Sequence, residues 1–576
     1  MARKTPFSDN APLGGLPRIR LRKGFPWWES LPAMRGTSHL EQVITYLQGC
    51  RWFQSKARII SGLELVETVL LKQGGTEFPV FFLKVTYPEG DPEIYQIPLA
   101  FLTGSDAAQL FTESPHAVIA CLSIGDEEGF LCDAVHDRKF REALLAFILG
   151  RRQLHGEKGG ILGAGHAAVF RHESAAVPEH LPSELFNSEQ TNSTLIYGSR
   201  HVLKLFRKVE PGINPEAEIS RFLTEKALFP HAPPFQAVVE LRKAGDQPYT
   251  LALLHGYMKN KGNAWQLSRR LLARYFERIL SRPDDLASPP NHPPGLLEGS
   301  QCAVPEIIVE LMGGFHLKMA GLLGQRTAEL HLAFAAGEDD PVWRMEKYST
   351  TYQRSLYQSQ RTQARRTLQL LAREREKLSG EDQKLADGVL AAEEEIIARL
   401  KLIVGHRIAA MKTRTHGDFH LGQVLFTGND FAIIDFEGEP ARSLSERRLK
   451  QSPLRDVAGM IRSFHYVAHT ALAHQVAGRP TDLPLLEPWA EACYHHVGCR
   501  FLKGYLDRIS GTSLVPSDRR DLETLLRAFI LDKALYELAY ELNNRPDWVA
   551  LPLKGIEGIL RECRVDLHQE EGQKGL

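Results

Sequence analysis

The chain has 576 residues, of which 43% are hydrophobic, 24% charged and 9% aromatic, as in an ordinary globular protein. Lys plus Arg and Asp plus Glu both number 70, so the net charge is zero. This balance argues against a protein that coats nucleic acid, because such chains are normally basic. The longest purely apolar run, residues 143–149, is far shorter than the roughly 20 residues that cross a bilayer, so no membrane partner is expected. Seven scattered cysteines favour a reducing, cytoplasmic setting over a disulfide framework.

Three structured regions are predicted after a proline-rich leader, residues 1–37, that holds one short strand at 18–22. Residues 38–180 are predicted to form an N-terminal α+β domain. Its expected elements are a helix at 39–47, strands at 63–71, 80–87, 93–101 and 129–132, and a helix at 137–149. Residues 181–260 are expected to form a small antiparallel lobe of five strands with one inserted helix. These elements are strands at 185–188, 194–197, 201–207, 238–243 and 249–256, and a helix at 215–226.

Residues 261–576 are predicted to be mostly helical, because apolar residues recur there at helical spacing opposite charged faces. The expected helices cover 264–282, 320–336, 350–379 and 381–411, and helices return from 456 after a β-hairpin at 423–426 and 431–436. The two long helices leave two alternatives, a coiled-coil dimer arm or an intramolecular hairpin. We favour the intramolecular hairpin, because the apolar spacing is not sustained as strict heptads.

The strongest chemical signal is the segment 415–423, Thr-His-Gly-Asp-Phe-His-Leu-Gly-Gln, followed by Asp-Phe-Glu-Gly-Glu at 435–439. The predicted hairpin would place Asp418 and Asp435 side by side although they lie 17 positions apart. Phosphoryl transfer needs such an arrangement: one carboxylate accepts the proton of the attacking hydroxyl, and another holds the magnesium ion that bridges the nucleotide phosphates. Gln423, five residues after Asp418, offers an amide oxygen as a further hard ligand.

Kinase chemistry also requires a cation upstream, and Lys204 lies within an apolar strand pattern at 202–206. A lysine that faces inward must find a partner for its charge, and Glu216 and Glu218 on the next helix are both candidates. The loop at 187–194 is the candidate phosphate-covering segment. It has no glycine, so phosphate would be met by backbone N–H groups and by short polar side chains. Those side chains are Ser188, Gln190, Thr191, Asn192 and Ser193.

The segment 532–548 is the candidate saccharide site, because sugar sites combine aromatic faces with amide, carboxylate and guanidinium groups. Tyr536 and Tyr540 lie four residues apart, on one helix face, although such pairs more often pack than bind. The other candidate groups of the segment are Glu537, Glu541, Asn544, Arg545 and Trp548. A second cluster, Cys-Tyr-His-His-Val-Gly-Cys at 493–499, is not expected to bind zinc, because its four potential ligands fall on two helix faces.

Several of these segments together resemble bacterial maltokinases, including those fused behind trehalose synthase. The resemblance rests on the two motifs above and on Arg-Trp-Phe-Gln-Ser-Lys at 51–56, Glu-Gln-Thr-Asn-Ser at 189–193, Leu-Gly-Gln-Arg-Thr-Ala-Glu-Leu-His at 323–331 and Tyr-Glu-Leu-Asn-Asn-Arg-Pro at 540–546. It extends from about residue 38 to 560. It implies an α+β, protein-kinase-like fold of the aminoglycoside phosphotransferase type, with an N-terminal cap domain, an intermediate nucleotide-binding lobe and a helical C-lobe. One departure is Asn263, where the family more often has an acidic residue.

The resemblance also implies an activity and roles for single residues. The activity is transfer of the ATP γ-phosphate to C1 of maltose, for α-glucan and glycogen synthesis, with Mg²⁺ as the metal. Asp418 would be the base, Gln423 and Asp435 the metal ligands, Lys204 the phosphate lysine and Glu218 its partner. The motifs further assign His416, His420 and Glu437 to substrate binding. The alternatives are a kinase for another sugar or amino sugar such as glucosamine, and a non-catalytic partner of trehalose synthase. The latter is disfavoured because the four chemical residues Lys204, Asp418, Gln423 and Asp435 are all present.

Overall fold

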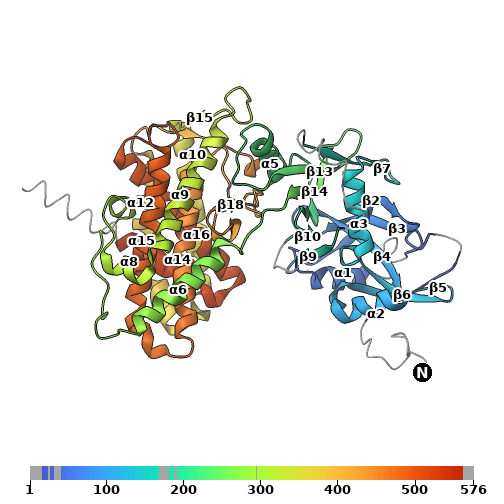
Figure 1. Cartoon of the computed structure of the whole chain (residues 1–576), viewed down its shortest axis with the longest axis horizontal. Coiled ribbons are helices and arrows are strands. Elements are labelled where there is room, and N and C mark those ends of the chain that lie inside the picture. Colours follow the sequence, from blue (N-terminus) through green and yellow to red (C-terminus); the bar gives the residue numbers. More distant parts are fainter. Residues whose placement is uncertain are drawn as a thin grey trace, which may run out of the picture. The chain divides into compact units, whose positions relative to one another are not determined.

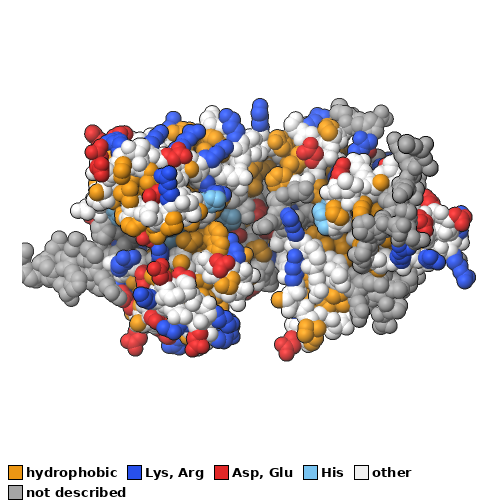
Figure 2. Space-filling model, turned by 90° about the horizontal axis from the view of Figure 1, so that it is seen from below, with side chains coloured by type: hydrophobic (Ala, Val, Ile, Leu, Met, Phe, Trp, Pro, Cys, Tyr) orange, Lys and Arg blue, Asp and Glu red, His pale blue; other side chains and the backbone are white. Residues whose placement is uncertain are grey.

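The computed structural model describes residues 16–23, 26–31, 40–167, 181–186, 191–293 and 295–561. The chain divides into two compact units. The first contains residues 1–225 and 233–258, and the second contains residues 226–232 and 259–576. Figure 1 shows that strands dominate the first unit and helices the second. On the face drawn in Figure 2, basic and acidic side chains are interspersed over each unit.

The first unit contains two seven-stranded sheets. The strand order of the N-terminal sheet is β1-β5-β6-β4-β3-β2, and β12 also pairs with β4. Its strands are β1 (Arg18–Leu21), β2 (Gly62–Gln73), β3 (Thr76–Thr86), β4 (Glu93–Thr103), β5 (Val118–Ile124), β6 (Glu127–Asp133) and β12 (Lys208–Val209). The helices of this region are α1 (Leu40–Gly49), α2 (Gly104–Glu113) and α3 (Arg138–Leu149). The predicted helices and strands of this region are therefore present, and α2 and β5 are additional.

The second sheet has the order β7-β8-β13-β14-β11-β10-β9. Its strands are β7 (Gln153–His155), β8 (Ile161–His166), β9 (Ser183–Phe186), β10 (Ser193–Tyr197), β11 (His201–Leu205), β13 (Phe235–Arg242) and β14 (Tyr249–Gly256), with α5 (Pro215–Glu225) inserted. The prediction of five strands was wrong, because β7 and β8 join this sheet through β13. They lie in a glycine-rich stretch whose sequence lacks the apolar alternation of a strand.

A buried Arg–Asp pair connects the two sheets of the first unit. Nη2 of Arg207 lies 2.7 Å from Oδ2 of Asp133, at the end of β6, and both side chains are almost completely buried. Arg207 also donates through Nε to the hydroxyl of Ser193 at 2.8 Å, and its guanidinium lies over the ring of Trp52. One hydrophobic core, with Val69 of β2 among its members, includes residues of both sheets. The N-terminal domain and the small lobe therefore share a core.

The second unit is a helical bundle that surrounds a short hairpin. Its helices are α6 (Ala264–Leu280), α7 (Leu296–Gly299), α8 (Glu306–Met312), α9 (Gly314–Ala335), α10 (Thr350–Glu374), α11 (Gly380–Ala391), α12 (Glu393–Lys401), α13 (Leu444–Arg447), α14 (Leu454–Val476), α15 (Leu483–Ile509) and α16 (Arg519–Asn544). The hairpin is β17 (Val424–Phe426) and β18 (Phe431–Ile433), and β15 (Glu346–Lys347) pairs with β16 (Met411–Lys412). Residues 550–561 are also helical.

Close packing defines this bundle. Helices α9 and α15 approach most closely at Gly324 and Gly504, where an added Cβ would overlap the backbone of the facing helix. Helix α10 packs against α12 and α16 of the same chain, as the intramolecular alternative required. The helix predicted at 381–411 is instead two helices, α11 and α12, because the backbone leaves helical geometry at Ala392.

Within the described residues, no helix by itself has the length and apolar composition needed to cross a membrane. Helices α8 and α9 meet that test only as a pair, and they are bent by 93° relative to each other.

Substitution of Arg207 by Met should destabilise the first unit, because it leaves the buried carboxylate of Asp133 without its partner. We expect a loss of about 3–5 kcal/mol in the free energy of unfolding. Urea unfolding followed by circular dichroism measures this change. The matched control is Lys23→Met, which breaks an ion pair between exposed side chains in the same unit and should leave the unfolding midpoint unchanged. Equal midpoints for both variants would contradict a structural role for Arg207.

Candidate active site

We call residues 415–423 the catalytic loop, because they contain the predicted base Asp418. This loop and the hairpin that follows it lie together in the helical unit. Strands β17 and β18 pair with Val424 opposite Ile433, so the chain returns to the loop. The side-chain Nε2 of Gln423 donates to Oδ2 of Asp435 at 2.6 Å. Asp435 has a backbone φ of 69°, in the left-handed region that residues other than glycine seldom adopt and that is enriched at active sites. The hairpin thus joins the two predicted metal ligands.

A buried carboxylate, that of Asp456 on α14, holds the catalytic loop. Its Oδ2 accepts a hydrogen bond from the backbone N–H of His416 at 2.7 Å, and its Oδ1 accepts one from the N–H of Gly417 at 3.0 Å. Nε2 of His331 on α9 lies 3.1 Å from Oδ2, and Nδ1 of the same ring lies 3.0 Å from the Tyr505 hydroxyl on α15. Three helices therefore meet at this carboxylate. Sequence analysis missed Asp456, although its partner His331 stands in a segment that carried the family resemblance.

The charge on Asp456 is maintained by its hydrogen bonds. Burial by itself would raise the pKa of this carboxyl group. The hydrogen bond and charge of His331, together with the backbone donor at Gly417, outweigh burial and hold the pKa below its usual value. Asp456 is therefore ionised at neutral pH, and a charged acceptor binds backbone N–H groups more strongly than a neutral one.

Gly417 lets the loop meet the segment that follows the hairpin. Its φ of 86° lies in the region that favours glycine, and an added Cβ would lie 3.1 Å from Cα of Gly438. His416 is buried between the rings of Phe419 and Phe436, and its Nε2 lies 2.9 Å from the carbonyl oxygen of Ile434. The assignment of His416 to substrate binding is therefore corrected: this side chain packs the loop against the hairpin.

The carboxylate of Asp418 lines a cavity in the second unit. Nζ of Lys533 on α16 lies 3.6 Å from its Oδ1, and Nε2 of His420 lies 3.9 Å from its Oδ2. Burial lowers the pKa of His420 more than the nearby carboxylate of Asp418 raises it, so this imidazole is neutral. The remaining polar and charged side chains of the cavity are Gln363, Glu439, Arg442, Arg455, Asp456, Asp532 and Tyr536.

Tyr536 is the only predicted saccharide contact from the segment 532–548 among the described residues that line this cavity. Burial, and then the carboxylates of Glu439 and Asp418, raise the pKa of Tyr536, so its hydroxyl keeps its proton. Lys533 lies against the same ring, with Nζ 4.8 Å from its centroid. Sequence analysis did not single out Asp532 and Lys533, although they begin the very segment it selected.

The other predicted saccharide residues of the segment contact each other at a different level of the helix. The guanidinium of Arg545 lies over the rings of Tyr540 and Trp548 and donates to Glu541 at 2.8 Å. Asn544 donates from its amide to the carbonyl oxygen of Tyr540. Glu541 is buried, whereas Tyr540 is 45% exposed. Glu537 instead pairs with Arg462 at 2.9 Å, and Glu437 is partly buried two residues after Asp435.

Lys204, the lysine predicted to contact phosphate, belongs to the first unit. Lys204 lies on β11, opposite Thr194 of β10, and its Nζ is 2.8 Å from Oε2 of Glu216 on α5. The pair is thus with Glu216, one of the two candidates, whereas the role that the resemblance gave to Glu218 stays a prediction. Side chains two residues apart on a helix point about 200° apart, so Glu216 and Glu218 lie on nearly opposite faces of α5.

The candidate phosphate-covering loop is described only from Thr191 onward, and Ser188 and Gln190 lie outside the described residues. The Ser193 hydroxyl accepts a hydrogen bond from Arg207, and Oδ1 of Asn192 lies 3.4 Å from the Arg207 backbone nitrogen. The assignment of Ser193 to phosphate is corrected, because its side chain is buried and bound to this arginine. Thr191 and Asn192 are partly exposed and remain candidates.

Two solved structures share the fold of this chain. The chain is similar to glucosamine kinase in complex with glucosamine, ADP and inorganic phosphate, with a TM-score of 0.54 and 18% identity over 90% of this chain and 98% of that one. A second crystal form of glucosamine kinase gives a TM-score of 0.56 at 18% identity, over 88% and 96% of the two chains. The chain thus has a fold similar to that of glucosamine kinase, with an N-terminal cap, a β-rich lobe and a helical lobe.

Sequence comparisons identify the cap. Residues 46–137 match the family described as the maltokinase N-terminal cap domain, so the chain carries this domain. Two curated relatives are glucosamine kinases. The one from Streptacidiphilus jiangxiensis is 26% identical over 290 residues, which are 49% of this chain and 59% of the relative. The one from Mycolicibacterium smegmatis is 34% identical over 158 residues, or 26% and 34% of the two chains. The chain therefore spans less than two thirds of either relative.

Substitution of Asp456 by Asn should loosen the catalytic loop, because a neutral amide is a weaker acceptor for the two backbone N–H groups. We expect a loss of about 1–3 kcal/mol in the free energy of unfolding at neutral pH. Since the folded-state pKa of Asp456 is lowered, its stabilising contribution is complete above the ordinary carboxyl pKa and is lost as pH falls through the lowered value. The difference between wild type and variant should therefore shrink in acid.

Chemical denaturation at several pH values measures this difference. The control is Asp507→Asn, an exposed carboxylate on α15 whose ion-pair partner is Lys503, one turn earlier on the same helix. A stability difference for Asp456→Asn that stays constant from neutral to acid pH would contradict the proposed charge.

Proposed function

We propose that this protein is an ATP-dependent kinase that phosphorylates a hydroxyl group of a small sugar. The observation that carries the proposal is the cavity beside Asp418, where carboxylates, a tyrosine hydroxyl and cationic groups converge. The Gln423–Asp435 pair belongs to the hairpin that follows the same loop. Such a set of donors and acceptors suits vicinal hydroxyl groups. The kinase fold supports the same conclusion.

In the proposed reaction, the sugar oxygen attacks the γ-phosphorus of ATP and ADP leaves. Asp418 orients the hydroxyl and accepts its proton, which is general-base assistance. Lys204, held by Glu216, neutralises charge on the α- and β-phosphates. Asp435 offers carboxylate oxygens and Gln423 an amide oxygen, and these are the hard ligands that Mg²⁺ takes in proteins. When bound, Mg²⁺ would offset the negative charge of the phosphates.

Maltose, phosphorylated at C1, is the acceptor that we propose first. The cap domain and the motifs around Asp418 and Asp435 support it. Its product would enter α-glucan synthesis, with trehalose synthase as a candidate partner. Glucosamine is the second candidate, because both curated relatives and the similar solved structures bear the name glucosamine kinase.

A screen of ADP release tests the activity and the acceptor together. Purified protein with Mg²⁺-ATP should release ADP with maltose well above the rate without acceptor, and glucose, trehalose and glucosamine are run beside it. The Asp418→Asn variant should lower kcat about 10²–10⁴-fold, because it removes the proton acceptor. Its matched control is Asp430→Asn, a carboxylate of the same hairpin that pairs with Arg326 instead.

Three outcomes would change the proposal in different ways. Preference for glucosamine would replace maltose and leave the kinase proposal standing. No release of ADP with any of the sugars would contradict a sugar kinase. A kcat of Asp418→Asn within about threefold of wild type would remove Asp418 from the role of base, since general-base assistance is worth far more.

Substitution of Tyr536 by Ala should raise KM for the acceptor sugar, because it removes an aromatic face and a hydroxyl donor from the cavity. We expect a change of about 1–3 kcal/mol, which is on the order of 5- to 150-fold in KM, with little change in KM for ATP. The control is Tyr540→Ala, one turn further along α16 and largely outside the cavity, which should leave the sugar KM unaltered. Steady-state kinetics and a melting temperature are measured on the same preparations. A larger effect of Tyr540 than of Tyr536 would move the sugar site along the helix.

A further inference from the structure

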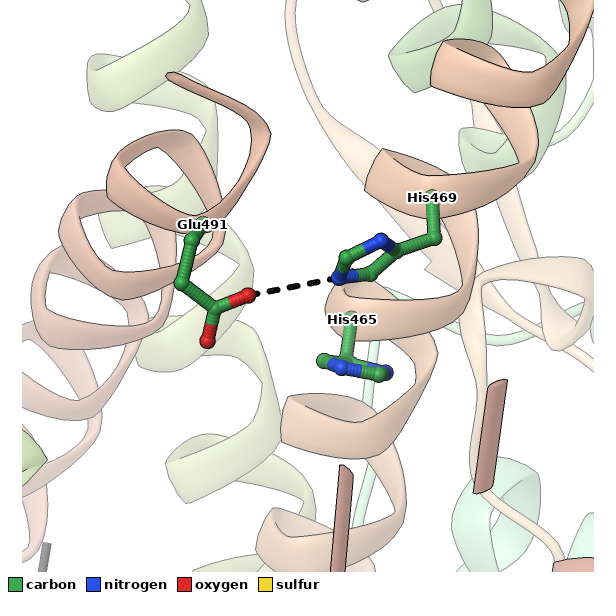
Figure 3. Close-up of side chains that lie close together, drawn as sticks. All are labelled: His465, His469 and Glu491. Atoms are coloured by element: carbon green, nitrogen blue, oxygen red, sulfur yellow. Dashed lines mark hydrogen bonds and ion pairs between the residues drawn. The ribbon is translucent and has the colours of Figure 1, made fainter. Parts of the chain in front are cut away.

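A cluster of possible metal ligands lies on the packed helices α14 and α15, apart from the cavity beside Asp418. His465 and His469 are one turn apart on α14, and Glu491 is on α15 (Figure 3). One ligand atom from each side chain lies within 4.8 Å of the others. The two imidazole rings lie close together, with centroids 4.4 Å apart. Figure 3 shows both histidines on the side of α14 that faces Glu491.

We propose that His465, His469 and Glu491 bind a divalent transition metal of the zinc type. Two histidines and one carboxylate are a frequent ligand set of Zn²⁺ sites that keep an open position for water. Two ligand atoms at about 2.0–2.1 Å from a tetrahedral zinc ion are about 3.3 Å apart. Nε2 of His469 and Oε2 of Glu491 are separated by 3.3 Å, which is long for a charge-assisted hydrogen bond.

An unsatisfied buried atom is a second, independent observation at this site. Nδ1 of His465 is buried and has no hydrogen-bond partner among the described residues, and the residue is only 3% exposed. A buried polar atom without a partner costs free energy, and a ligand explains why such an atom is kept. The ring of Tyr494 packs edge-on against His465 and forms an apolar wall beside it.

The charges around the cluster suit a cation. Burial, and then the charge of Arg462, lower the pKa of His465, so its imidazole is neutral and able to coordinate. Although burial raises the pKa of Glu491, the hydrogen bond and charge of His469 and the charges of Arg561 and His292 together lower it more, so the carboxylate is ionised. Three cations lie near the cluster: Arg462, which pairs with Glu537 at 2.9 Å, Lys554, which pairs with Glu487 at 2.5 Å, and Arg561 beside Glu491.

Metal can reach this site, and the site is separate from phosphoryl transfer. The Glu491 side chain is 47% exposed, whereas that of His469 is 5% exposed, so the carboxylate forms the open side. His465 follows Asp456 by nine residues on α14, which is about 13 Å along the helix axis. A metal bound here would connect α14 to α15, two helices that already meet at the carboxylate holding the catalytic loop.

Binding of Zn²⁺ alone, without nucleotide, tests the proposal on the full chain after treatment with a chelator. Equilibrium dialysis should give close to one tightly bound Zn²⁺ per chain, and Co²⁺ should give the visible absorption of a tetrahedral N/O site. Glu491→Gln and His469→Gln should each weaken binding more than about tenfold, as changes around metal sites commonly do. The matched control is His474→Gln, an exposed histidine on the same helix, which should bind metal as wild type does.

A second measurement keeps the test valid if a buried histidine is needed for folding. Zn²⁺ should raise the melting temperature of wild type and of His474→Gln, because a ligand of the folded state stabilises it, and should leave Glu491→Gln unshifted. Absence of stoichiometric binding to wild type would overturn the proposal. So would equal binding by wild type, Glu491→Gln and His469→Gln, which would assign the metal to other histidines such as His292, His495 and His496. Kinase activity enters none of these readouts, so the proposed function and this site fail independently.

Discussion

The catalytic loop depends on one buried carboxylate, that of Asp456. It accepts hydrogen bonds from the backbone of His416 and Gly417, directly before Asp418, and it also meets the imidazole of His331. A charged acceptor in the interior is costly unless its lone pairs are satisfied, and here backbone and side-chain donors satisfy them. The position of Asp418 is thereby set by the packing of α9, α14 and α15 and not by the loop alone.

The same principle of satisfied buried charge recurs in the first unit. Arg207 and Asp133 are almost completely buried, and Arg207 also bonds Ser193, a residue that sequence analysis had placed on the phosphate. Lys204 is held by Glu216, so its ammonium group has a fixed direction. In each unit, residues proposed for chemistry lie beside a charged group that positions them: Glu216 for Lys204 and Asp456 for the loop that contains Asp418. Removing one member of such a pair lowers the free energy of unfolding by more than the pair itself contributes, because the remaining charge is left buried without a partner.

Much of the fold followed from periodicity and turn residues. Helix α3 and strands β4 and β14 lie close to their predicted ranges, because apolar spacing is strong there and glycine or proline bounds the segments. Strands β7 and β8 were missed, since a glycine-rich stretch has no alternation and forms strands only by pairing with β13. The break between α11 and α12 was missed as well, because a change of backbone direction at Ala392 leaves no signal in helix-forming residues.

The sequence by itself determined which residues can carry the chemistry: Asp418, Gln423 and Asp435 stand around a hairpin with the spacing that phosphoryl transfer needs. Only the tertiary structure decided which partners they have. Asp456 and Lys533 come from helices far along the chain, and no local pattern distinguishes them from other acidic or basic residues on amphipathic helices. Glu216 rather than Glu218 is seen to pair with Lys204, and Tyr536 rather than Tyr540 lines the cavity. Both outcomes depend on how the helix concerned, α5 or α16, is rotated about its axis. That rotation is set by packing against the rest of the core, which a one-dimensional pattern does not contain.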